Sequence, residues 1–190
     1  MFIRGEFIGP IYTNDSFMTT LISATNRLNS STLKVTNAYA RLMQEKGMEI
    51  NVVNIEDIPV ETVTDAIYRK GENSMRTYGH QIFNSADRFV VIVPEYNGSI
   101  PGILKLLIDC CDPTIFKGKK FALVGVASGR AGNLRGMDHL TDVFHYLQAE
   151  VYSLKLPVSQ VFQLMNEERE VADPATLEVL SKQIDGFTKF

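Results

Sequence analysis

The chain has 190 residues, of which 45% are hydrophobic and 22% charged, and it carries a formal net charge of −3. This composition fits one globular domain with its own core, and the mixed charge gives no electrostatic basis for binding nucleic acid or an acidic membrane. The N-terminal residues lack the continuous apolar stretch of a signal peptide, and no run is long enough to span a bilayer, so we expect a cytoplasmic protein.

Short apolar runs alternate with segments of helical periodicity along most of the chain. We expect residues 1–16 to form an irregular arm and residues 17–190 to form the domain. The expected strands are 17–23, 49–55, 88–93, 121–127 and a short fifth strand that starts at 150 and continues toward 156. The expected helices are 31–46, 75–85, 100–111, 134–148 and a last one that begins at Pro174, with Asp173 as its N-cap; residues 63–72 are ambiguous and could be irregular.

The central strands at 88–93 and 121–127 are apolar almost throughout. Buried strands that alternate with helices indicate a parallel sheet covered on both faces. The pattern predicts an α/β, doubly wound, flavodoxin-like three-layer sandwich with a five-stranded parallel sheet in the order 2-1-3-4-5. In this order the loops after strands one, three and four meet at the carboxyl edge of the sheet, where such folds bind ligands.

The first of these loops, residues 23–30, is rich in hydroxyl and amide side chains, carries one cation and opens a helix. A helix N-terminus presents unpaired N–H groups, and hydroxyls and an arginine add donors for phosphate oxygens. The same residues are equally compatible with a helix start that is simply capped. The candidate phosphate-binding residues are Ser23, Thr25, Arg27 and Ser30.

The second loop, residues 94–99, combines backbone amides with the Tyr96 ring and the Asn97 amide, a mixture that can line a planar heterocycle. Pro94 should close the preceding strand, Asn97 and Gly98 allow positive φ, and Pro101 suits the first turn of a helix. A tight turn with solvent-facing polar groups explains the same residues without a ligand. The candidate ring-binding residues are Pro94, Glu95, Tyr96, Asn97, Gly98 and Ser99.

The third loop contributes Ser128, Gly129 and Arg130, followed by Gly132. Its two glycines would let the backbone approach a ligand, although a flexible connection accounts for them as well. The chain has neither a glycine-rich dinucleotide fingerprint nor a Walker pattern. One phosphate cradle and two walls for a flat ring therefore fit a mononucleotide cofactor such as FMN better than a dinucleotide.

These three loops resemble those of the NADPH-dependent FMN reductase family, which includes quinone, azo and chromate reductases. The segment from Pro94 to Ser99, with Ile100-Pro101-Gly102, resembles the family's central signature, and residues 23–30 resemble its Ser-Gly-Ser-x-Arg-x-x-Ser pattern. Ala24 replaces the glycine of that pattern, which leaves phosphate binding intact only if φ is negative there. The resemblance covers roughly residues 17 to 155.

The resemblance implies an FMN-dependent NAD(P)H oxidoreductase with bound FMN and with NADPH or NADH as co-substrate. Hydride would pass from the nicotinamide to the flavin, and electrons would then pass to a flavin, quinone or similar small-molecule acceptor in a ping-pong cycle. Residues 23, 25, 27 and 30 would hold the FMN phosphate, while residues 94–99 and 128–130 would surround the ring. The family also implies a homodimer or homotetramer.

Two other classes of function stay open: an FMN-binding electron carrier, and a non-enzymatic binding module on the same fold. We expect no catalytic acid, base or nucleophile and no metal site, because the cofactor supplies the chemistry. His80, His139 and His145 are scattered and are expected to be structural or on the surface. The adjacent Cys110 and Cys111 match no redox or zinc spacing and are expected to be packing residues.

Overall fold

The computed structural model describes residues 18–68 and 73–190, so the arm predicted for residues 1–16 lies outside the described residues. The strands are β1 (Thr19–Ser23), β2 (Ile50–Asn54), β3 (Arg88–Pro94), β4 (Lys120–Val126), β5 (Glu150–Val151) and β6 (Leu156–Val158). The α-helices are α1 (Ser31–Glu45), α2 (Val60–Tyr68), α3 (Ser74–Phe83), α4 (Gly102–Asp109), α5 (Leu134–Tyr146) and α6 (Pro174–Lys189). Short 3-10 turns are η1 (Ile55–Asp57), η2 (Pro113–Phe116) and η3 (Val161–Leu164).

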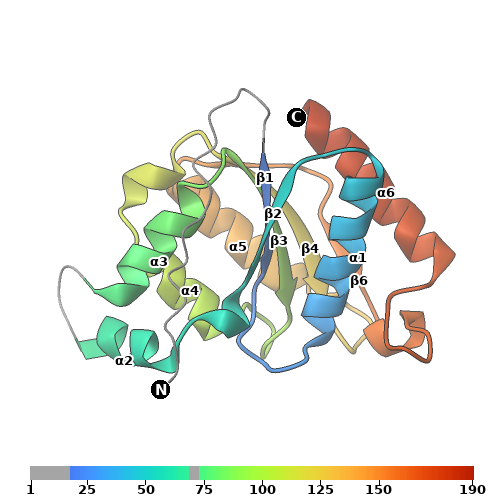
Figure 1. The fold of residues 1–190 in the computed structure, drawn as a ribbon, viewed down its shortest axis with the longest axis horizontal. Coiled ribbons are helices and arrows are strands. Elements are labelled where there is room, and N and C mark those ends of the chain that lie inside the picture. Colours follow the sequence, from blue (N-terminus) through green and yellow to red (C-terminus); the bar gives the residue numbers. More distant parts are fainter. Residues whose placement is uncertain (1–17, 69–72) are drawn as a thin grey trace, which may run out of the picture.

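The sheet is parallel and has the strand order β2-β1-β3-β4-β5, which confirms the predicted flavodoxin-like topology. Helices α1 and α6 cover one face, and α3, α4 and α5 cover the other, as Figure 1 shows. Side chains alternate between the two layers along each strand, so Val90 packs toward α1 and α6 and Val91 toward the opposite helices. The buried strands β3 and β4 are apolar because both of their faces are covered.

The last strand differs from the prediction, because β5 and β6 are separate pieces that both pair with β4. Gln183, a fully buried residue of α6, donates from Nε2 to the Leu123 carbonyl at 3.1 Å and to the Leu154 carbonyl at 2.6 Å. The Gln183 amide thus provides hydrogen bonds for the carbonyl oxygens of Leu123 in β4 and Leu154 between β5 and β6, where the ladder between the strands is interrupted. A side chain so distant in sequence could not be anticipated from the strand's own residues.

Two other local expectations need correction. The segment 63–72, which the sequence leaves ambiguous, overlaps most of α2. This helix begins at Val60, just after Pro59, and its residues Val63 and Ala66 pack against the core. Pro101 is the N-cap of α4 and does not lie in its first turn. Both prolines precede helices that begin one residue later, as expected for a residue with fixed φ.

Five fully buried phenylalanines form the core at the amino end of the central strands. The ring centroids of Phe121 and Phe144 lie 3.8 Å apart and those of Phe89 and Phe121 lie 5.1 Å apart, both in stacked arrangements. Phe83 contacts Phe116 at 4.7 Å between centroids. Through this aromatic cluster α3, η2 and α5 pack against the sheet at the edge opposite the predicted ligand loops.

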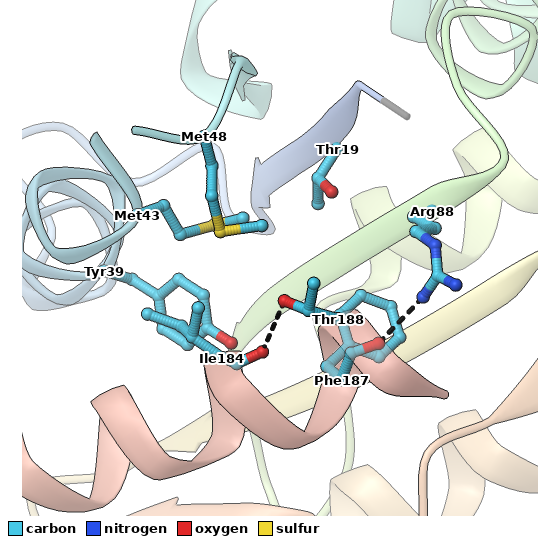
Figure 2. A pocket seen from close by; sticks show the side chains of 8 residues that line it. All are labelled: Thr19, Tyr39, Met43, Met48, Arg88, Ile184, Phe187 and Thr188. Atoms are coloured by element: carbon cyan, nitrogen blue, oxygen red, sulfur yellow. Dashed lines mark hydrogen bonds between the residues drawn. The ribbon is translucent and has the colours of Figure 1, made fainter. Parts of the chain in front are cut away.

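A small cavity of about 120 Å³ also lies at the amino edge (Figure 2). Its lining includes Thr19 and Arg88, the first residues of β1 and β3, and Arg88 donates to the Phe187 carbonyl of α6 at 2.7 Å. Tyr39 donates to Gln183 Oε1 at 3.1 Å, and burial raises the pKa of its hydroxyl. These contacts join α1 and α6 to the sheet, and they lie away from the three predicted loops.

The aromatic cluster leads to a stability prediction. Phe121→Ala should lower the free energy of unfolding by about 3–5 kcal/mol, because it removes the ring at the centre of the cluster and leaves a cavity. Tyr146→Ala is the matched control, since Tyr146 is 87% exposed and its loss should change stability by less than about 0.5 kcal/mol. Urea unfolding followed by circular dichroism measures both, and equal effects would contradict the assignment of this core.

Candidate functional site

The three predicted loops leave the sheet at the same edge, and backbone hydrogen bonds extend the parallel ladder one residue past the ends of β1, β3 and β4. Ala24 N–H donates to the Ile92 carbonyl at 2.9 Å, and Glu95 N–H donates to the Val126 carbonyl at 2.9 Å. Ala127 N–H donates to the Val158 carbonyl at 3.0 Å. The carboxyl ends of β1, β3, β4 and β6 therefore form one continuous edge, as the sequence predicts.

The first loop is a capped entry into α1. Ser30 is the N-cap, and its Oγ accepts from Leu33 N–H at 3.1 Å, while Thr25 Oγ1 accepts from Arg27 N–H at 3.2 Å. The positive-φ residue of this loop is Asn29, with φ of 50°, so Ala24 has the negative φ that tolerates a side chain. The first turn of α1 contains no acidic residue, so nothing there opposes an anion.

Ser23 differs from the other candidates in this loop because it is fully buried. Its Oγ has no hydrogen-bond partner among the residues that the structure describes. Thr25 is 1% exposed and Ser30 is 6% exposed, whereas Arg27 is exposed. The loop thus combines an accessible cation with hydroxyls that lie at its base.

The second loop is a tight two-residue hairpin turn. Tyr96 and Ser99 exchange two backbone hydrogen bonds, each of 3.0 Å, around Asn97 and Gly98, whose φ angles are 52° and 78°. Positive φ at both central residues is the mark of a type I′ turn, for which Asn-Gly is the preferred pair. Pro94 is buried as the last residue of β3, one residue later than expected, while Glu95 and Tyr96 are half-buried and Asn97 is exposed.

One hydrogen bond joins the first loop to the second. Thr25 Oγ1 and the Tyr96 hydroxyl lie 2.7 Å apart, and the Arg27 guanidinium lies over the Tyr96 ring at 5.1 Å from its centroid. Three predicted site residues from segments 71 positions apart are therefore in contact. The first and second loops therefore share one polar and cationic surface.

The third loop is hydrogen-bonded to the segment that follows β6. Gln160 N–H donates to the Gly129 carbonyl at 3.0 Å, and Ser159 Oγ donates to the Arg130 carbonyl at 2.8 Å. Ser128, Gly129 and Arg130 are exposed at the edge, as a binding role requires.

Gly132 has a different role from the one predicted for it. A Cβ at this position would lie 2.4 Å from the Pro157 Cβ, and φ is 56°, so the glycine is required by close chain packing and not by approach to a ligand. A Cβ at Gly129 would meet nothing within 4 Å, so of the two only Gly129 leaves open space at the edge.

Sequence reasoning missed Asn133, which links the second and third loops. This residue is fully buried with a φ of 64°, and its Nδ2 donates to the Val93 carbonyl at 2.9 Å. The bond ties the end of β3 to the start of α5. Asparagine is enriched at positive φ, which is the signal that could have marked it.

His139 of α5 also reaches the site, since its Nδ1 shares a hydrogen bond of 2.9 Å with Ser99 Oγ. His80 instead accepts from Asp112 N–H at 3.2 Å, in keeping with a structural role. No group of three or more His, Cys, Asp or Glu residues that could hold a metal occurs within residues 18–68 and 73–190. In the same residues, no helix is both long and apolar enough to cross a membrane.

The cysteines behave as packing residues. Cys111 is buried, its Sγ donates to the Leu107 carbonyl at 3.2 Å, and burial raises the pKa of its thiol to about 12. Burial, with Asp109 nearby, also raises the pKa of Cys110. A Cβ on Gly79 of α3 would lie 2.2 Å from Cys111 Sγ and 3.3 Å from the Leu107 carbonyl oxygen, so α3 packs directly on α4 and the residues that follow it.

The comparisons with known proteins agree with this geometry. The family model for NADPH-dependent FMN reductases matches residues 18–163, a range that contains all three loops. The chain belongs to this family. It is therefore an oxidoreductase of a family defined by FMN and NADPH.

Individual relatives carry related names. The chain is 28% identical over 145 residues to an NAD(P)H-dependent FMN reductase of Pseudomonas aeruginosa, covering 73% of this chain and 76% of that protein. It is 31% identical over 153 residues to a quinone reductase of Escherichia coli K12, covering 76% and 79%. A solved flavoenzyme NAD(P)H:(acceptor) oxidoreductase from Paracoccus denitrificans superposes with a TM-score of 0.71 at 21% identity, covering 90% and 94%, which shows the shared fold.

The buried amide of Asn133 leads to a second stability prediction. Asn133→Asp should lower the free energy of unfolding at neutral pH by about 1–3 kcal/mol, because a carboxylate oxygen would face the Val93 carbonyl in place of a donor. The deficit should shrink as the pH falls toward about 5, because burial raises the pKa of an aspartate and the protonated acid can donate.

The control for this prediction is Asn29→Asp, since Asn29 also has positive φ but is exposed. Its stability should change little between the two pH values. Urea denaturation at both pH values measures the pair. A deficit of Asn133→Asp that grows at lower pH would show that the amide does not act as the donor we describe.

Proposed function

We propose that this chain binds FMN at the carboxyl edge of the sheet and reduces a small-molecule acceptor such as a quinone or free flavin at the expense of NADPH or NADH. The observation that carries the proposal is the hydrogen bond between Thr25 and Tyr96, at 2.7 Å, which places the phosphate-type loop and the ring-type loop on one surface. The family match over residues 18–163 covers both loops.

The residues present fit the phosphate of FMN. Arg27 is an exposed cation at the N-terminus of a 15-residue helix whose first turn holds no acidic side chain. In the proposed site Arg27, Thr25 and Ser30 would donate to phosphate oxygens, together with the unpaired N–H groups of the helix start. Ser23 is fully buried at the start of the same loop, and its hydroxyl, which has no partner among the described residues, would be left to donate to the phosphate side of the site.

The second and third loops fit a flat ring. The type I′ turn holds residues 94–99 in a fixed shape and uses the N–H groups of Tyr96 and Ser99, so the Asn97 side chain and the N–H groups at the tip of the turn, Asn97 and Gly98, would present donors without further ordering. Ser128, Gly129 and Arg130 would border the ring from the third loop, where Gly129 leaves open space. When bound, the flavin would accept hydride from NAD(P)H and pass electrons to the acceptor in alternate half-reactions.

We also infer a homodimer or homotetramer that acts in the cytoplasm. Large apolar side chains are exposed on segments at or near the carboxyl edge, with Leu28 75%, Val60 73% and Phe162 61% exposed. Apolar residues in such positions are typical of surfaces that contact another subunit. Light scattering after size-exclusion chromatography measures the assembly directly.

The function is tested by spectroscopy on the purified protein. We expect a yellow protein with an absorption band near ~450 nm, the ordinary signature of oxidised flavin, which NADPH or NADH bleaches rapidly without oxygen. Slow bleaching by both nicotinamides would favour the electron carrier. A colourless protein that takes up no added FMN would contradict the proposal and favour the non-enzymatic module.

The phosphate role of Arg27 can be tested separately. Arg27→Ala should weaken FMN binding about 10- to 100-fold, since a charge-assisted hydrogen bond contributes roughly 1.5–3 kcal/mol. Affinity for riboflavin, which lacks the phosphate, should stay nearly the same. Arg41→Ala, at an exposed arginine further along α1, is the matched control. Fluorescence titration measures the affinity of each variant for FMN and for riboflavin. If Arg27→Ala lost the same affinity for both ligands, Arg27 would not contact the phosphate.

A further inference from the structure

His139 of α5 is hydrogen-bonded to the second loop, although the sequence predicts only a structural or surface role for it. Its Nδ1 and Ser99 Oγ lie 2.9 Å apart. Because a serine hydroxyl can both donate and accept, this hydrogen bond forms with either tautomer of the neutral imidazole. His139 is exposed and Ser99 is half-buried, so the imidazole is not needed to fill the core of the domain.

The bond gives the type I′ turn at residues 96–99 a second side-chain support. Tyr96 and Ser99 close this turn by exchanging two backbone hydrogen bonds. The Tyr96 hydroxyl is also bonded to Thr25 of the first loop at 2.7 Å, and the Ser99 hydroxyl is bonded to His139 of α5. Each of the two residues that close the turn is therefore held by a side chain from a different part of the chain.

The tip of the turn, in contrast, is open. Asn97 is exposed, and a Cβ on Gly98 would meet nothing within 4 Å among the described residues. A turn with fixed flanks and an open tip suits ligand binding, because a loop that is ordered beforehand loses little entropy when the ligand arrives. The orientation of the tip depends on the two flanking bonds, and one of them comes from a residue outside the predicted binding residues.

Helix α5 provides a rigid support for that bond. Asn133, its N-cap, donates from Nδ2 to the Val93 carbonyl at 2.9 Å, and Met137 and Leu140 are fully buried in the core. The same helix thus contacts the second loop on both sides, at Val93 just before it and at Ser99 at its end. His139 therefore fixes the turn relative to the strand from which the loop leaves.

We propose that His139 is a positioning residue for the flavin ring: through Ser99 it holds the turn at residues 96–99 in the orientation that binds the ring. The inference rests on the proposed function, because it assigns a further residue to the same site. Since the bond acts on the second loop, its loss should weaken binding of the ring equally with and without the phosphate. This is the opposite of the pattern expected for Arg27.

The test compares the binding of FMN and of riboflavin by fluorescence titration. His139→Ala should weaken both by the same factor, about 3- to 10-fold, because it removes one hydrogen bond that orders the turn. His139→Asn should bind both like the unaltered protein, because the asparagine amide can take the place of Nδ1 beside Ser99. His145→Ala, at an exposed histidine of the same helix, is the matched control and should change neither affinity.

Two further measurements separate positioning from a general loss of structure. Ser99→Ala combined with His139→Ala should weaken binding no more than the stronger single change, because both remove the same bond. In the protein without flavin, the Tyr96 and Ser99 amides close the turn, and their hydrogen exchange should be about 3- to 10-fold faster in His139→Ala. His145→Ala should leave this exchange unchanged.

The outcomes distinguish the positioning role from the proposed function. If His139→Ala binds both flavins like the unaltered protein, loses affinity for FMN alone, or is matched by His139→Asn in its loss, the positioning role is overturned and the proposed function stands. An unaltered protein that takes up neither FMN nor riboflavin would overturn the proposed function, and the positioning role with it.

Discussion

The parallel pairing of β1, β3 and β4 is the constraint on which the site depends. The ladder continues one residue past β1 and β3, through Ala24 and Glu95, and it fixes the offset between the two loops: Ser23 pairs with Ile92, two residues before the end of β3. Only then can Thr25 and Tyr96 meet across 71 positions of sequence. A register shift of one residue would turn Ser23 and Pro94 to the opposite faces and separate the loops. The site is therefore a property of strand pairing before it is a property of its side chains.

Local chemistry made much of this arrangement predictable. The Asn97-Gly98 pair predicted a turn with positive φ, and the structure has one with both residues in that region. Asp173 and Pro174 predicted the start of α6, where Asp173 accepts from Thr176 N–H. Continuous apolar strands predicted the parallel sheet and its order. In each case the residues that decide the structure are neighbours in sequence.

What could not be predicted depends on contacts between distant residues. The break between β5 and β6 is stabilised by Gln183, and Gly132 is fixed by Pro157, so neither was visible in its own segment. The pairing of Thr25 with Tyr96 followed only in outline, because the topology brought the loops together without specifying which side chains touch. The burial of Ser23 likewise follows from packing on both faces of β1.

The aromatic cluster has a consequence for how this protein can change. Phe89 and Phe121 lie at the amino ends of β3 and β4, while the loops predicted to bind a ligand leave from the carboxyl ends of the same strands. The core that stabilises the fold and the loops predicted to bind the ligand are thus separated along each strand. Loop residues can be exchanged with little loss of foldability, so new acceptor preferences can evolve on an unchanged foundation.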